Sequence, residues 1–127
     1  MNGKKIMVVD DEKDILDFFT IFLKQKNYEV VVASSGEEAL IKAQLEKPNL
    51  IFLDIMMPRM DGWEVLKLLK LDEETARIPV AMLSARTEAK DKVRGLQEGA
   101  VDYICKPFSP RELLKKIEHI IGQQQPA

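Results

Sequence analysis

The sequence has a single cysteine and no long apolar run, and each scarcity excludes a class of protein. With Cys105 alone among 127 residues, the chain cannot form an internal disulfide bond and is compatible with a reducing compartment. No apolar run approaches the roughly 20 residues of a membrane helix, and the first run is too short for a signal peptide. We therefore expect a soluble cytoplasmic domain with no membrane partner.

The chain also lacks an excess of charge of one sign and the usual nucleotide-binding loops. Nineteen Lys and Arg against 21 Asp and Glu give a net charge of -2, which argues against direct nucleic-acid binding by a broad basic face. Neither G-x-x-x-x-G-K nor G-x-G-x-x-G occurs, so the sequence does not support a nucleotide-binding function. The length suits one domain. We expect the fold in residues 1–121 and a polar tail or truncated linker in 122–127.

What the sequence does contain is a series of short apolar runs. They are rich in Val, Ile and Leu, do not alternate with polar residues, and occupy 6–9, 30–33, 50–53, 78–83 and 101–105. Runs of this kind are typical of strands that are covered on both faces of a sheet.

Segments with helical periodicity follow each run, and several begin with a capping pattern. The patterns are Ser35-x-x-Glu38, Asp61-x-x-Glu64 and Ser109-Pro110-Arg111-Glu112, in which a side-chain oxygen can accept from the first turn. The segment 87–97 is weaker, because it offers only Ala89, Val93 and Leu96 for burial. Strands alternating with helices predict an α/β fold with helices on both faces of a parallel sheet.

Chemically versatile side chains follow four of the runs, at the point where each strand is expected to end. They are Asp10, Asp11, Asp54, Ser84 and Lys106. Ligands of such sheets bind outside the carboxyl ends of the strands. We therefore expect three carboxylates, a hydroxyl and an amine to meet at one edge, provided that these strands are neighbours.

Carboxylates gathered within about 4–5 Å repel one another by on the order of 4 kcal/mol per pair. Such a cluster can take up a proton or recruit a cation. Because only oxygen ligands are available, a hard divalent ion is favoured, and Mg²⁺ suits carboxylates that also meet a phosphate. With the Lys106 ammonium beside it, this site suits transfer of a phosphoryl group to a carboxylate nucleophile.

The chain resembles the receiver domain of two-component response regulators from about residue 4 to residue 121. The resemblance rests on VVDDE at 8–12, LDIMMPRMDG at 53–62, MLSA at 82–85 and DYICKPF at 102–108. It implies the flavodoxin-like fold of the chemotaxis regulators. That fold is a doubly wound, five-stranded parallel sheet of order 2-1-3-4-5, with five helices on its two faces.

The resemblance also implies a role for each acid. Asp54 would accept the phosphoryl group, and Asp10, Asp11 and Asp54 would bind Mg²⁺ together with the backbone carbonyl of Met56. In this family the side chains at Met56 and Arg86 flank the path of attacking water. Methionine cannot orient water by strong hydrogen bonds, so we predict slow self-dephosphorylation.

The remaining site residues would carry the response. Ser84 would hydrogen-bond the phosphoryl group, Lys106 would pair with its oxygens, and the bond from Lys106 to Pro107 would be cis. Tyr103 would be a switch that turns inward when Ser84 moves. The responding surface would comprise the fourth helix, the fifth strand and the fifth helix.

The implied partners are a sensor histidine kinase or a phosphotransfer protein, and either a downstream effector or a C-terminal output domain. The stretch KPFSPRELL at 106–114 resembles receivers attached to winged-helix transcription factors. Val101, however, replaces an acid that is common at their dimer face. The domain is expected to be a monomer or a phosphorylation-dependent dimer, and to catalyse only its own phosphorylation and dephosphorylation.

Two other classes of function compete with this reading. A Mg²⁺-dependent phosphatase of the dehalogenase type needs a second aspartate two residues after the nucleophile, where this chain has Met56. The alternative that stays open is a protein-binding module of the same fold that works without phosphorylation. Such modules usually lack one of the site residues, and this chain has them all.

Overall fold

The computed structural model describes residues 3–85 and 89–122. Their parallel strands are β1 (Lys5–Val9), β2 (Glu29–Ala33), β3 (Leu50–Asp54), β4 (Val80–Ser84) and β5 (Asp102–Cys105). The helices between and after them are α1 (Lys13–Gln25), α2 (Gly36–Glu46), α3 (Gly62–Leu71), α4 (Ala89–Gln97) and α5 (Pro110–Gly122). The expectations for Arg86, for the side chain of Ala89 and for residues 123–127 lie outside the described residues.

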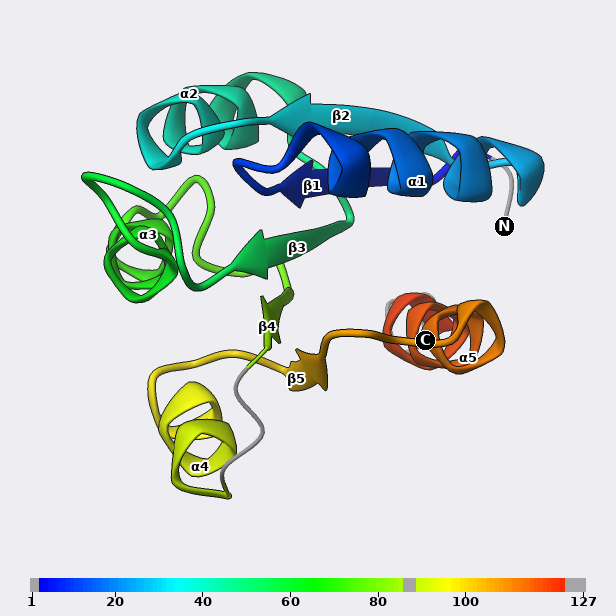
Figure 1. Ribbon diagram of the computed structural model, residues 1–127. Helices are drawn as coiled ribbons and strands as arrows, with labels where there is room; N and C mark the ends of the chain where they lie inside the picture. Colours follow the sequence, from blue (N-terminus) through cyan, green and yellow to red (C-terminus); the bar gives the residue numbers. More distant parts are fainter. Residues whose placement is uncertain (1–2, 86–88, 123–127) are drawn as a thin grey trace.

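The sheet order is β2-β1-β3-β4-β5, so the α/β fold and the strand order predicted from the sequence are confirmed. Helices α1 and α5 cover one face of the sheet, and α2, α3 and α4 lie on the other (Figure 1). Residues 6–9, 50–53 and 80–83 are all fully buried, because both faces of the central strands are covered. Within the described ranges, no helix is both long and apolar enough to cross a membrane.

The capping patterns predicted at the starts of α2, α3 and α5 are present. The acceptors are Ser35 Oγ, an Asp61 carboxylate oxygen and Ser109 Oγ, and each accepts from the backbone N–H three residues later, at 3.0–3.1 Å. Each cap satisfies a backbone donor that the first turn leaves unpaired. The caps thus fix where these helices begin, just beyond the carboxyl edge of the sheet.

Gly62 determines how closely α3 approaches β3. A Cβ at this position would lie 2.4 Å from the carbonyl oxygen of Asp54 and 2.7 Å from the Cα of Ile55. The Gly62 N–H donates to the Ile55 carbonyl at 2.8 Å. Only glycine fits this contact, so the loop between β3 and α3 is held tightly against Asp54.

Helix α4 buries different residues from those expected. Val93 and Leu96 are 51% and 60% exposed, whereas Asp91 and Gly95 are buried. A Cβ on Gly95 would lie 3.5 Å from the Tyr103 ring, so the helix rests on β5 through its backbone. The expectation that Val93 and Leu96 are buried is wrong. The helix turns the face that carries Gly95 toward the sheet, because the absence of a side chain there lets its backbone approach Tyr103 closely.

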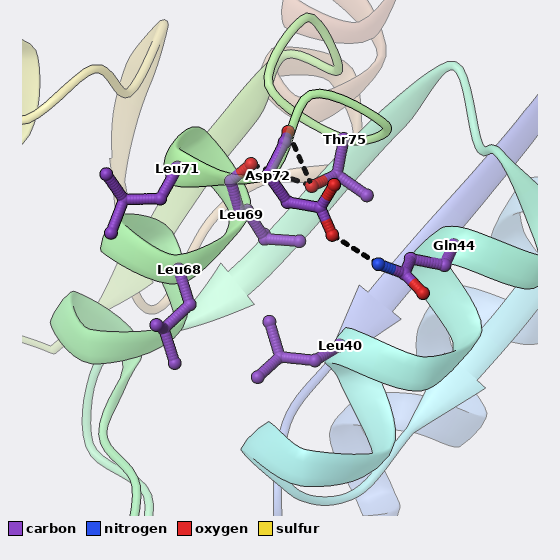
Figure 2. A pocket seen from close by; sticks show the side chains of 7 residues that line it. All are labelled: Leu40, Gln44, Leu68, Leu69, Leu71, Asp72 and Thr75. Carbon is purple, nitrogen blue, oxygen red and sulfur yellow. Dashed lines mark hydrogen bonds between the residues drawn. The ribbon is translucent and has the colours of Figure 1, made fainter.

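A groove of about 320 Å³ lies between α2 and α3, away from the strand ends. Its walls come from these two helices and the loop after α3: Leu40, Gln44, Leu68, Leu69, Leu71, Asp72 and Thr75 (Figure 2). The Gln44 amide donates to the Asp72 carboxylate across it, and Thr75 Oγ1 donates to the Leu69 carbonyl at 2.7 Å. The first bond ties the end of α2 to the loop after α3, and the second ties that loop back to α3.

Candidate functional site

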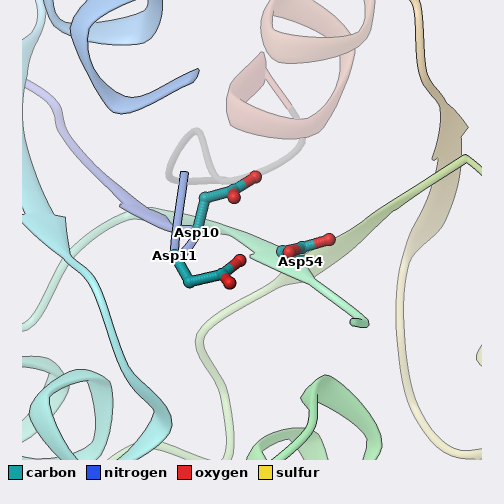
Figure 3. Close-up of side chains that lie close together, drawn as sticks. All are labelled: Asp10, Asp11 and Asp54. Carbon is teal, nitrogen blue, oxygen red and sulfur yellow. The ribbon is translucent and has the colours of Figure 1, made fainter. Parts of the chain in front are cut away.

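Three carboxylates meet at the carboxyl edge of the sheet (Figure 3). Asp10 and Asp11 follow β1, and Asp54 ends β3, which is paired with β1. One carboxylate oxygen from each residue lies within 4.8 Å of the other two. Asp10 is fully buried and Asp54 is 3% exposed, whereas Asp11 is exposed. The predicted acidic cluster is therefore assembled, and solvent reaches it on the Asp11 side.

Lys106, directly after β5, places its ammonium against this cluster. Its Nζ lies 2.9 Å from Asp10 Oδ2 and 3.5 Å from Asp54 Oδ1. Burial pushes the pKa of Lys106 down, but the hydrogen bond to Asp10 and the charges of Asp54, Asp10 and Glu12 outweigh it, so the pKa is raised. Lys106 is thus a fixed positive charge at neutral pH, and its peptide bond to Pro107 is cis, as expected.

Burial and the adjacent charge of Asp10 raise the pKa of Asp54 to about 7. The Lys106 charge and a hydrogen bond from the Met56 backbone N–H pull this pKa down, and Asp11 adds to the repulsion. Ionised Asp54 is therefore costly here, and added positive charge would lower that cost. Clustered carboxylate oxygens are the hard ligands that Mg²⁺ prefers, so the residues present fit this ion.

Ser84 and Tyr103 occupy the two neighbouring strands. Ser84 ends β4, is fully buried, and pairs in register with Cys105, the residue before Lys106. Tyr103 lies on β5, is 6% exposed, and packs against Gly95 of α4. The structure thus brings Ser84 to the same edge as the acids and places Tyr103 beneath α4. Their roles in switching, and the role of the Met56 carbonyl in binding metal, stay predictions.

Sequence reasoning missed Glu12 as a neighbour of the site. Glu12 Oε1 lies 3.6 Å from Lys106 Nζ, and the Glu12 N–H donates to Asp10 Oδ1 at 2.9 Å. The only signal in the sequence was its place in the run of three acids. The structure adds that Glu12 orients the Asp10 carboxylate through its backbone and faces Lys106 with its side chain.

An apolar hollow beside Lys106 was also missed. It has a volume of about 460 Å³ and is lined by Glu12, Ile15, Phe18, Ala85, Lys106, Pro107 and Phe108. The Phe18 and Phe108 rings lie 5.7 Å apart between centroids, and they come from α1 and from the segment after β5. The helical position of Phe18 could be seen in the sequence, but the approach of Phe108 depends on the fold.

Comparison with known proteins gives one consistent family. The model of the response regulator receiver domain matches residues 6–118. The alkaline phosphatase synthesis transcriptional regulatory protein PhoP of Bacillus subtilis is 48% identical over 97% of this chain and 50% of its own length. The phosphate regulon transcriptional regulatory protein PhoB of Pseudomonas aeruginosa is 41% identical over 99% of this chain and 55% of its own length. The chain therefore spans about half the length of these curated relatives.

Solved structures agree with the sequence relatives. The chemotaxis protein CheY4 of Vibrio cholerae has a TM-score of 0.87 at 34% identity, covering 92% of this chain and 98% of that chain. A two-component response regulator from Clostridium difficile has a TM-score of 0.91 at 27% identity, covering 98% of this chain and 100% of that chain. With the matched model, the shared fold and the relatives in agreement, the chain belongs to the receiver domain family of two-component response regulators.

Proposed function

We propose that this receiver domain accepts a phosphoryl group on Asp54 in a Mg²⁺-dependent reaction. The observation that carries the proposal is the position of Asp54, which is nearly buried among two other carboxylates and the Lys106 ammonium. Phosphoryl transfer needs positioning and charge stabilisation more than covalent chemistry from the protein. A carboxylate nucleophile with a cation site and a fixed ammonium beside it meets that need.

The phosphoryl donor would be a phosphohistidine or a small acyl phosphate. An oxygen of Asp54 would bond to phosphorus as the bond to the donor breaks, and the electron pair would return to the imidazole or carboxylate that leaves. Lys106 would pair with the phosphoryl oxygens, and Ser84 would donate a hydrogen bond to them.

Asp10, Asp11 and Asp54 would hold Mg²⁺ together with the backbone carbonyl of Met56. When bound, the ion would supply positive charge that Lys106 alone does not provide. The chain's own contribution is to hold the ligands in place: the Glu12 N–H orients Asp10, and the Met56 N–H orients Asp54.

Phosphorylation would bias a two-state equilibrium through Ser84 and Tyr103. The responding surface would be that of α4, β5 and α5. A hollow of about 200 Å³ on it is lined by Lys92, Tyr103, Ile104, Cys105, Pro107, Glu112 and Lys116, so a movement of Tyr103 would alter its shape directly.

The partners proposed are a sensor histidine kinase or a phosphotransfer protein in the cytoplasm, and an effector protein or a C-terminal output domain. An output domain is supported by the curated relatives, which are about twice as long and bear names of transcriptional regulators. The domain would act as a monomer or a phosphorylation-dependent dimer. It would catalyse only its own phosphorylation and dephosphorylation.

The test is the intact mass of the purified domain after incubation with Mg²⁺ and acetyl phosphate. We expect a gain of one phosphoryl group that is lost in Asp54→Asn and in a chelator-treated sample. Asp17→Asn, which changes an exposed acid on α1, serves as the matched control and should gain the group normally. A gain that survives in Asp54→Asn would refute the assignment. If neither acetyl phosphate nor a histidine kinase phosphorylates the domain and Mg²⁺ leaves Trp63 fluorescence unchanged, the binding-module alternative replaces the proposal.

A further inference from the structure

Helix α4 buries few of its described side chains against the rest of the domain. Among its described residues, Asp91 and Gly95 are buried, and the remaining described residues from Lys90 to Gln97 are exposed. Gly95 contributes only backbone to the contact with Tyr103. A helix with so little apolar burial opens at low cost, so individual contacts have a large influence on its position.

One such contact links α4 to α3. The guanidinium carbon of Arg94 lies 4.2 Å from the centroid of the Trp63 ring, which is a cation–π arrangement. Glu98, in the turn directly after α4, accepts from Arg94 Nε at 2.6 Å and holds the guanidinium in place. Arg94 therefore bridges the two helices, and the turn after its own helix fixes its orientation.

Trp63 is in turn tied to the phosphoacceptor residue. It directly follows Gly62, whose backbone packs against the Asp54 carbonyl. A hollow of about 540 Å³ lies between this region and α4, lined by Ile55, Met56, Met57, Asp61, Trp63 and Arg94. Met56 is 62% exposed, and its backbone N–H hydrogen-bonds the Asp54 carboxylate. The hollow therefore reaches Met56, whose backbone N–H contacts the Asp54 carboxylate, and the Trp63–Arg94 pair forms part of its wall.

We propose that Arg94 is a positioning residue that latches α4 to α3 through Trp63 and restricts the path of water to Asp54. The inference rests on the proposed function, since the restricted reaction is hydrolysis of the Asp54 phosphoryl group. In that step a water oxygen bonds to phosphorus, the bond to Asp54 breaks, and inorganic phosphate leaves. An exposed cation–π contact changes an opening equilibrium by about two- to five-fold, so loss of the latch should accelerate hydrolysis by that factor.

The first measurement is hydrogen–deuterium exchange of the α4 amides in the absence of any phosphoryl donor. Arg94→Met, which keeps the length of the side chain but removes its charge, should raise this exchange about two- to five-fold. Arg94→Lys keeps a cation over Trp63 and should restore most of the protection. Arg77→Met removes an exposed arginine from the loop after α3 and should have no effect. Unchanged α4 exchange in Arg94→Met, or an equal rise throughout the domain, would overturn the latch.

The second measurement is the lifetime of the phosphoryl group after the donor is removed. Arg94→Met should shorten it about two- to five-fold, and Trp63→Leu should do the same without adding to the effect of Arg94→Met in the double variant. Additive effects would overturn the proposal. If Asp54 accepts no phosphoryl group, the proposed function fails, while the exchange experiment still decides whether the latch exists. If Asp54 is phosphorylated and Arg94→Met keeps the parental lifetime, the latch fails alone.

Discussion

Replacing Asp54 by Asn should stabilise the metal-free domain at alkaline pH. The pKa of Asp54 is about 7 in the fold, against 3.8 for an unperturbed aspartate. The folded state therefore binds this proton more tightly than the unfolded state does. The contribution of Asp54 to stability is full below pH 4 and falls as the pH rises to 7, because folding must then take up a proton that the unfolded chain has released. Above pH 7, folding must instead bury the ionised carboxylate. Asparagine resembles the protonated carboxyl group and stays neutral at every pH, so the variant does not lose this stability as the pH rises.

The rise of the Asp54 pKa from 3.8 to about 7 corresponds to a free-energy difference of about 4 kcal/mol between the ionised and protonated forms. Solvent on the Asp11 side of the cluster reduces this figure, so we expect Asp54→Asn to raise the free energy of unfolding by about 2–4 kcal/mol at pH 8 and by little at pH 4. Lys106 keeps its partner Asp10 in the variant, at 2.9 Å, so the substitution does not isolate that ammonium.

Urea unfolding in the presence of a chelator, at pH 4 and at pH 8, measures this difference. The slope against urea should be unchanged, which would show that stability and not compactness has altered. Asp17→Asn is the control: Asp17 pairs with Lys13 on the surface at 2.8 Å, and loss of so exposed an ion pair should have little effect on stability at either pH. A variant no more stable than its parent at pH 8, or a gain of equal size at pH 4, would refute the electrostatic reasoning.

Three further predictions concern the site and its support. Lys106→Met should abolish the phosphoryl gain. It should also raise the pKa of Asp54 further, because the Lys106 charge lowers that pKa. Carboxyl NMR titration measures the Asp54 pKa, and an unchanged value would contradict the electrostatic role of Lys106. Gly62→Ala should destabilise the fold by about 3 kcal/mol, because its Cβ would meet backbone 2.4 Å away. Gly122→Ala, with nothing within 4 Å, should be nearly neutral in the same denaturation assay. Met56→Asn should lose its phosphoryl group faster than the parent, measured by intact mass over time, and an equal or slower loss would count against the predicted role of this side chain.

The strands and the acidic cluster could be predicted because both depend on local patterns. Fully buried strands require continuous apolar runs, and the runs at 6–9 and 50–53 satisfy this directly. Parallel strands end at the same edge of the sheet, so an acid after each run brings Asp10 and Asp54 together once β1 and β3 are neighbours. That strand order came from the family resemblance. The caps at Ser35 and Ser109 were likewise encoded within four residues.

The parts that could not be predicted depend on how separate elements approach one another. The exposed faces of Val93 and Leu96 follow from the contact between Gly95 and Tyr103, which apolar spacing cannot reveal. The pKa of Asp54 depends on burial and on distances to other charges. The stacking of Arg94 on Trp63 joins two helices that are far apart in the chain, so no sequence pattern indicated it.

Because Lys106 is synthesised after the three acids, its position affects how the carboxyl edge of the sheet forms during synthesis. Asp10 and Asp11 leave the ribosome first, Asp54 next and Lys106 last. Since β1 and β3 pair directly, a partial chain without β5 could gather the three carboxylates with no ammonium among them. Their mutual repulsion opposes closure of this edge, so closure requires that Asp54 keeps a proton, that β5 brings Lys106, or that a divalent cation binds. The amine that would serve the phosphoryl group thus also offsets the negative charge at the edge where the sheet closes.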